Sequence, residues 1–144
     1  MLECSRRGAL RPGAARPAAR PRREEPIMNV RRVVPNLRTE DPEACGAFYA
    51  RIGLSPAMEL GWITTLTGTG GGASPVQLSL MTEDLTGPVV PDLSIEVDDV
   101  DAAYEELRAA GAELLFPVRD EEWGVRRFFV RDPDGRVVNI LGHR

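Results

Sequence analysis

The feature of this sequence that most constrains its fold is an order of strand and helix signals that occurs twice. In the first half, the alternation of residues 29–38 predicts a strand. Thr39 or Asp41, followed by Pro42, is typical of a capped helix start, and Gly53 is typical of a helix end. Further strands are expected at residues 61–67 and 76–81, with residues 56–59 supplying part of another.

The second half repeats this order. Residues 92–97 alternate between polar and apolar and predict a strand. Asp98 or Asp99 is expected to cap a helix over residues 100–110, which Gly111 ends. A strand is then expected to start over residues 114–118, and two more strands form a hairpin over residues 123–141.

The two halves also align at their helix ends. Asp41 corresponds to Asp99, and Gly53 corresponds to Gly111. This correspondence predicts an α+β fold built from two βαβββ modules, at residues 28–84 and 89–144, with a linker at residues 88–91 between them.

The hairpin over residues 123–141 has a turn whose chemistry is readable from the sequence. Pro133 sets its own φ, Gly135 tolerates a positive φ, and Asp132 can accept hydrogen bonds from the backbone that follows it. Aromatic and β-branched residues flank the turn on both sides. The segment is therefore predicted to form two antiparallel strands.

These segments closely resemble the vicinal oxygen chelate superfamily, which includes glyoxalase I, extradiol dioxygenases, fosfomycin-resistance enzymes and bleomycin-binding proteins. The resemblance rests on residues 94–104, 111–113 and 123–141, and it extends over residues 28–144. It implies a curved mixed sheet that encloses a cup, formed by two modules of one chain or by exchange between two chains. It also implies a homodimer and a small-molecule ligand in the cup.

Metalloenzymes of this superfamily carry ligands on the first and last strands of a module, usually His and Glu. The resemblance places Arg32 and Asp92 at the first-strand positions, and Gln77 and Asn139 at the last-strand positions. A guanidinium repels a divalent ion, and an amide is a weak ligand. The single histidine, His143, lies beyond the last expected strand and is not expected to rescue the site. We therefore predict no cofactor and disfavour a divalent metal, which argues against metal-assisted chemistry.

Strand alternation assigns further side chains to the wall of the cup. Arg32 and Asn36 share one face of the first strand, and Arg127 and Phe129 share one face of the strand that precedes Asn139. Planar cations, amides and aromatic rings suit a polyfunctional organic ligand. The predicted ligand contacts are Arg32, Asn36, Trp62, Gln77, Asp92, Trp123, Arg127, Phe129 and Asn139.

Several of these residues also have a purely structural interpretation. Trp62 and Phe129 equally suit an ordinary apolar core. Arg126 and Arg127 suit a charge pair on an edge strand, which discourages aggregation. For Arg32 the alternative is an ion pair with Asp92 across the module interface and no other role.

Composition removes several classes of function. The chain has no lysine, which excludes a lysine Schiff base, and it has only two cysteines, Cys4 and Cys45, which fits a reducing cytosol. It has no apolar run of the roughly 20 residues that a membrane-spanning helix needs. Residues 1–26 carry seven Arg and three Glu, so the remainder is acidic and disfavours nucleic acid as a partner.

Residues 1–27 are rich in Arg, Pro and Ala and have no hydrophobic period, so we expect them to be disordered. Met28 directly precedes the first patterned strand. Translation from Met28 would give a complete domain, and the upstream residues would then not belong to the native protein.

The sequence thus favours a cytoplasmic homodimer that binds a small organic molecule without a metal, similar to bleomycin-type resistance proteins that sequester an antibiotic. The alternative is a lyase, isomerase or dioxygenase-like enzyme with a degenerate metal site, in which Asp92 or Glu96 is the general base. A third alternative is a non-catalytic partner module with a filled cup.

Overall fold

The computed structural model describes residues 28–68 and 76–144. The extension for which we expect disorder, residues 1–27, lies outside the described residues together with Cys4. The strand and helix order of the two halves is the one that the sequence predicts. The first half contains β1 (Val30–Arg38), α1 (Pro42–Ala50), β2 (Leu54–Glu59), β3 (Ile63–Gly68) and β4 (Gln77–Met81), and the second contains β5 (Leu93–Val97), α2 (Val100–Ala109), β6 (Arg119–Asp120), β7 (Val125–Arg131) and β8 (Val137–His143).

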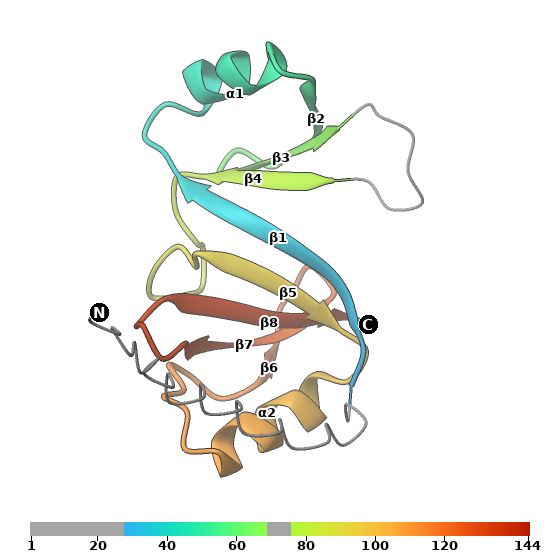
Figure 1. Cartoon of the computed structure of the whole chain (residues 1–144), viewed down its shortest axis with the longest axis vertical. Coiled ribbons are helices and arrows are strands. Elements are labelled where there is room, and N and C mark those ends of the chain that lie inside the picture. Colours follow the sequence, from blue (N-terminus) through green and yellow to red (C-terminus); the bar gives the residue numbers. More distant parts are fainter. Residues whose placement is uncertain (1–27, 69–75) are drawn as a thin grey trace, which may run out of the picture.

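All eight strands belong to one mixed sheet with the order β2-β3-β4-β1-β5-β8-β7-β6. β1 is parallel to β4 and antiparallel to β5, and β5 is parallel to β8. The β1–β5 pair therefore joins the two halves edge to edge, and α1 and α2 lie at opposite ends of the molecule (Figure 1). This is the α+β fold that the sequence predicts.

Aspartate side chains cap both helices, and the structure decides between the alternatives that the sequence left open. Asp41 accepts a hydrogen bond from the amide of Ala44 at 3.0 Å, and Asp99 accepts one from the amide of Ala102 at 2.9 Å. Each bond satisfies an amide that has no partner within its helix.

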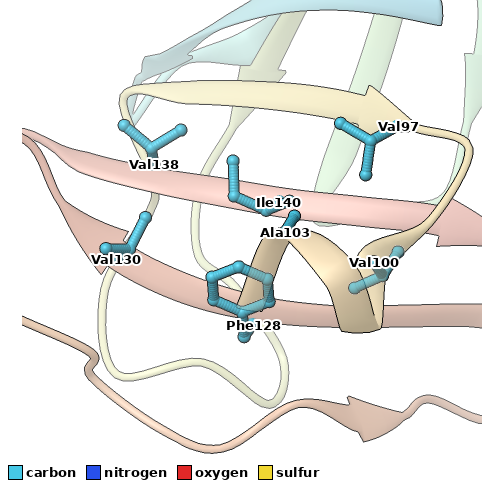
Figure 2. Close-up of a cluster of buried hydrophobic side chains, with 7 residues drawn as sticks. All are labelled: Val97, Val100, Ala103, Phe128, Val130, Val138 and Ile140. Atoms are coloured by element: carbon cyan, nitrogen blue, oxygen red, sulfur yellow. The ribbon is translucent and has the colours of Figure 1, made fainter. Parts of the chain in front are cut away.

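The best-packed core lies between α2 and the second half of the sheet. Seven buried side chains from β5, α2, β7 and β8 meet there (Figure 2). The ring of Phe128 is fully buried and makes an edge-on contact with Tyr104, with 5.1 Å between the ring centroids. Val138 and Ile140 face this core, which leaves Asn139 and Leu141 on the opposite side of the sheet.

The first half is packed less densely on its helical side. α1 has no buried residue, and Phe48 and Ile52 are 61% and 71% exposed. The two halves therefore repeat the same order of elements but not the same quality of core.

The prediction that a strand starts over residues 114–118 is wrong. Leu114 forms only an isolated bridge to Val130, and regular pairing is confined to Arg119 and Asp120. Pro117 has no amide hydrogen to donate to a ladder, so this part of the chain follows β7 without forming a regular strand.

The turn between β7 and β8 matches its predicted chemistry. Asp132 accepts hydrogen bonds from the amides of Asp134 and Arg136, both at 2.9 Å, and Gly135 has a φ of 86°. The predicted hairpin is therefore confirmed.

Candidate functional site

A cavity of about 400 Å³ lies on the face of the sheet opposite the α2 core. Its lining comes from β1, β2, β3, β4, β5, β7 and β8, so both halves of the chain contribute to it. Volumes of roughly 300–1,000 Å³ are typical of small-molecule sites. The cavity is therefore the first place to look for a ligand.

Two tryptophans form an aromatic wall of the cavity. Trp62 lies directly before β3 and Trp123 lies two residues before β7, so each half of the chain supplies one ring. Their ring centroids are 6.1 Å apart and their planes are tilted by 57°. Trp123 is 41% exposed, which leaves an aromatic surface that a ligand can cover.

The floor of the cavity is polar and uncharged. Asn36 on β1 is directly opposite Ser79 on β4, and Ser94 on β5 is directly opposite Asn139 on β8. The Ser94 hydroxyl oxygen accepts hydrogen bonds from the Nδ2 atoms of Asn36 and Asn139, at 2.8 and 3.1 Å. Asn139 Oδ1 is buried without a hydrogen-bond partner among the described residues. The amides and hydroxyls thus form a connected group that retains unused hydrogen-bonding capacity.

One end of the cavity carries a charged cluster. The Glu96 carboxylate forms a salt bridge with Arg32, with 2.9 Å between Arg32 Nε and Glu96 Oε2, and its other oxygen lies 2.9 Å from His143 Nδ1. Arg32 also donates to Gln77 Oε1 at 3.1 Å. Arg32, Gln77 and His143 line the cavity, and the Glu96 side chain is 15% exposed.

Arg127 also lines the cavity, but its guanidinium is bound to other protein groups. It donates two hydrogen bonds to Asp84, at 2.7 and 2.9 Å, one to Glu121 at 2.9 Å and one to Thr86 at 2.8 Å. The side chains of Arg127, Asp84 and Glu121 are each at most 6% exposed. We call Arg127, Asp84, Thr86 and Glu121 the arginine cluster.

Charge pairing sets the protonation of this cluster. Burial raises the pKa of Asp84, but hydrogen bonds and charge from Arg127 outweigh it and leave that pKa below its ordinary value. Burial likewise raises the pKa of Glu121, and hydrogen bonds from Thr86, Arg127 and Arg119 lower it below the ordinary value. The cluster therefore stays ionised at neutral pH, and its hydrogen bonds tie Asp84 and Thr86 to Arg127 on β7.

The structure brings together most of the residues that the sequence singled out. Seven of the nine predicted contacts line the cavity: Arg32, Asn36, Trp62, Gln77, Trp123, Arg127 and Asn139. That these residues bind a ligand stays a prediction.

The other two predicted contacts lie elsewhere. Phe129 is fully buried between Phe116, 4.8 Å away between ring centroids, and the segment at Gly87. Asp92 accepts a hydrogen bond from the amide of Val137 at 2.9 Å and is not part of the cavity lining. Phe129 thus follows its alternative interpretation as core, and Asp92 fastens the start of β8.

One structural expectation and two alternative interpretations of charged residues are wrong. Arg32 pairs with Glu96, its direct neighbour across β1 and β5, and not with Asp92. His143 is the last residue of β8 and lines the cavity, whereas the sequence placed it beyond the last strand. Arg126 and Arg127 do not form a charge pair on an edge strand, because Arg126 binds Asp101 and Asp120 while Arg127 faces the other side of the sheet.

Sequence reasoning missed several polar residues of this site, among them Ser79, Asp84, Ser94 and His143. Period-two alternation from Gln77 reaches Ser79, and the alignment of the two halves relates Asn36 to Ser94, so two of them had a usable signal. Asp84 lies in a connecting segment where no periodicity operates.

The side chains at the centre of the sheet do not fit a divalent cation. Asn36, Ser79, Ser94 and Asn139 offer only neutral oxygens, and Asn36 and Asn139 turn their Nδ2 atoms toward Ser94. Within residues 28–68 and 76–144, no three His, Cys, Asp or Glu side chains are grouped in a way that could hold a metal. Protein sites for such ions usually include carboxylate, imidazole or thiolate ligands.

Neither helix in the described part of the chain has the length and apolar character needed to cross a membrane.

Comparison with known proteins identifies a family and a fold. The family model described as Glyoxalase/Bleomycin resistance protein/Dioxygenase superfamily matches residues 30–140. No curated protein matches the sequence.

Solved structures are similar over most of their length. A glyoxalase/bleomycin resistance protein/dioxygenase superfamily member from Vibrio splendidus 12B01 is 21% identical with a TM-score of 0.57, and the match covers 79% of this chain and 99% of that one. The NAD-dependent benzaldehyde dehydrogenase from Legionella pneumophila is 16% identical with a TM-score of 0.63, and the match covers 78% of this chain and 100% of that one. Methylmalonyl-CoA epimerase from Mycobacterium tuberculosis is 20% identical with a TM-score of 0.55, and the match covers 77% of this chain and 86% of that one. At these identities the likeness shows a shared fold.

Proposed function

Because the chain belongs to the glyoxalase/bleomycin resistance protein/dioxygenase superfamily, we propose that it binds a small organic molecule in its cavity without a metal ion. Sequestration of an antibiotic is the form of this function that we favour. We also propose that the protein acts in the cytoplasm as a homodimer of two-module chains, with the modules at residues 28–84 and 89–144.

The observation that carries the proposal is the composition of the cavity wall. Trp62 and Trp123 offer ring surface on one side, while the amides and hydroxyls around Ser94 offer hydrogen bonds on the floor. Small-molecule sites combine such apolar surface with a few convergent polar groups. A ligand with an aromatic or apolar body and one or two polar substituents suits both surfaces.

The donor set supports the absence of a metal from the proposed function. A metal-dependent enzyme needs charged or imidazole ligands that converge on one point, and the converging groups here are Asn36, Ser79, Ser94 and Asn139. Arg32 adds a positive charge to the same cavity, which opposes a divalent cation.

The metal-free character is tested on the purified full chain. Metal content is measured, and thermal stability is followed during titration with Zn²⁺, Mn²⁺, Ni²⁺ and Fe²⁺. We expect no stoichiometric metal and no shift, whereas binding at 100 times the dissociation constant would stabilise the fold by about 2.7 kcal/mol. Stoichiometric metal with a clear shift would contradict the proposal.

Ligand binding is tested by the quenching of tryptophan fluorescence, because both tryptophans of the chain line the cavity. Aromatic compounds that carry amide or carboxylate groups are screened, and hits are confirmed by calorimetry. Trp62→Leu should weaken binding by about tenfold, which corresponds to roughly 1.4 kcal/mol of aromatic contact. The control is Phe48→Leu, since Phe48 is exposed on α1 and outside the cavity. Equal binding by wild type and Trp62→Leu would remove the aromatic wall from the site.

A further inference from the structure

The charged cluster at the end of the cavity has the geometry of a general base. His143 is the only histidine of the chain, and the strand pairing of β8 with β5 holds it beside Glu96. Its Nδ1 atom lies 2.9 Å from the Glu96 carboxylate. A carboxylate only accepts hydrogen bonds, so the nitrogen that faces it must carry the hydrogen.

This contact decides the tautomer of the neutral imidazole. With the hydrogen on Nδ1, the lone pair lies on Nε2, which has no hydrogen-bond partner in the part of the chain that the structure describes. The His143 side chain is 54% exposed and lines the cavity, so a bound molecule can reach it. The ring is thus available as a proton acceptor.

Glu96 is itself held in place. Arg32 lies directly opposite it across the β1–β5 pair, and its Nε atom forms a salt bridge with the second carboxylate oxygen at 2.9 Å. Arg32 is in turn bound to Gln77 through Nη1. The order Gln77, Arg32, Glu96, His143 is therefore a row of side chains in which each member orients the next. A base that is oriented by a fixed third group is a recurrent arrangement in acid–base catalysis.

We propose that His143 is a general base, positioned by Glu96, that removes a proton from a carbon acid bound in the cavity. This inference rests on the proposed function, because the cavity must first hold the molecule. Nε2 takes the proton, and the electron pair of the broken C–H bond stays on the substrate. The Glu96 carboxylate stabilises the imidazolium that forms, and Arg32 offsets negative charge that develops on the substrate.

The lining points to the class of substrate. Trp62 and Trp123 favour an aromatic or apolar body, and Arg32 favours an oxygen that becomes negative during the reaction. A carbon acid whose ionisation moves charge onto an oxygen satisfies both requirements. No metal takes part in this step.

The experiment uses 5-nitrobenzisoxazole, an aromatic carbon acid that fits this description. Removal of its C3 proton by Nε2 forms the nitrile and breaks the N–O bond, so the product, 2-hydroxy-5-nitrobenzonitrile, is released as a coloured phenolate. We expect the full chain to accelerate the reaction over buffer. His143→Gln should lower the rate by about 100-fold or to the buffer value, and Glu96→Gln by about tenfold. Glu105→Gln is the control, because Glu105 is an exposed residue of α2 that pairs with Arg108.

A second measurement separates positioning from a general structural effect. ¹⁵N spectra of the single histidine should show the hydrogen on Nδ1 in wild type. In Glu96→Gln the population should shift toward Nε2–H, because an amide presents a donor as well as an acceptor. An unchanged tautomer in Glu96→Gln would overturn the positioning role even if the rate fell.

Occupancy and catalysis are also distinguished. Calorimetry with 2-hydroxy-5-nitrobenzonitrile reports whether the cavity takes the compound. Binding without acceleration, or acceleration that survives His143→Gln, overturns the general base and leaves the proposed function standing. If the protein neither binds the compound nor accelerates the reaction, the inference is overturned for aromatic carbon acids. The compound screen then tests the proposed function on its own.

Discussion

At the scale of single residues, Arg127 illustrates how a side chain can line a cavity and still be committed to structure. Four of its hydrogen bonds go to Asp84, Thr86 and Glu121, and its side chain is only 4% exposed. Because these bonds use most of the hydrogen-bonding capacity of the guanidinium, Arg127 can offer a ligand little more than one edge of that group. We therefore regard Arg127 first as the centre of the arginine cluster.

Replacement of Arg127 by Met should destabilise the protein strongly. The change leaves the carboxylates of Asp84 and Glu121 buried without their cation, and breaking a buried pair in this way costs about 3–5 kcal/mol. Urea denaturation gives the free energy of unfolding. Arg126→Met is the control, because Arg126 pairs with two exposed aspartates and its loss should cost about 0–1 kcal/mol. Similar losses for both variants would contradict the role of the arginine cluster.

The same cluster predicts a pH dependence of stability. The pKa values of Asp84 and Glu121 lie below their ordinary values of 3.8 and 4.5, so their contribution is fully present above about pH 4.5. This contribution to stability is lost as the pH falls through the lower pKa values that the two carboxyl groups have in the folded protein. In Arg127→Met the buried carboxylates of Asp84 and Glu121 lack their cation and favour the protonated form. Their ionisation should therefore lower the free energy of unfolding of the variant, whereas in wild type it raises it. The difference in unfolding free energy between wild type and variant should therefore narrow from pH 7 to pH 3, and a constant difference would refute this account.

At the scale of elements, local backbone chemistry decides where strands and helices end. The β7–β8 turn depends on Gly135, whose φ of 86° is unfavourable for any residue with a Cβ atom. Gly46 lies inside α1, where helical φ suits alanine and no atom lies within 4 Å of an added Cβ. The backbone conformation therefore requires glycine at position 135 and tolerates alanine at position 46.

Alanine at these two positions should change stability in opposite directions. Gly135→Ala should destabilise by about 1–2 kcal/mol because it forces a left-handed conformation on a residue with a side chain. Gly46→Ala should stabilise by about 0.5–1 kcal/mol because alanine has less freedom to lose in the unfolded chain. Thermal unfolding of both variants gives the comparison. A shift in the same direction for both would mean that φ is not the controlling variable.

At the scale of the whole molecule, the β1–β5 pair places one cavity across two halves with unequal cores. Val97, Phe128 and Ile140 pack under α2, whereas α1 leaves Phe48 and Ile52 exposed. Large exposed apolar side chains commonly mark an interaction surface. This asymmetry is consistent with the proposed homodimer, in which a second copy would cover the α1 side.

The proposed dimer is tested by sedimentation velocity of the full chain. We expect a dimer at micromolar concentration and a shift toward monomer in Phe48→Glu combined with Ile52→Glu, because two charges cannot be buried without partners. Circular dichroism controls for folding. A monomeric wild type would overturn the dimer, and a dimer that tolerates both charges would move the interface away from α1.

The sequence alone determined the order of elements, the approximate starts of the helices, the β7–β8 turn and the face on which Arg32, Asn36 and Asn139 lie. These features depend on local chemistry and on period-two alternation, which act over a few residues. The resemblance of residues 28–144 to a known family supplied the sheet architecture, which the structure bears out.

Only the tertiary structure decided which side chains meet. Strand register brings Glu96 between Arg32 and His143, and the segment before residue 88 folds back to place Asp84 and Thr86 on Arg127. These contacts join residues that are far apart in the chain and belong to segments without shared periodicity. Their partners are chosen by burial and charge in three dimensions, because a buried arginine or carboxylate must find a counter-charge wherever the fold supplies one.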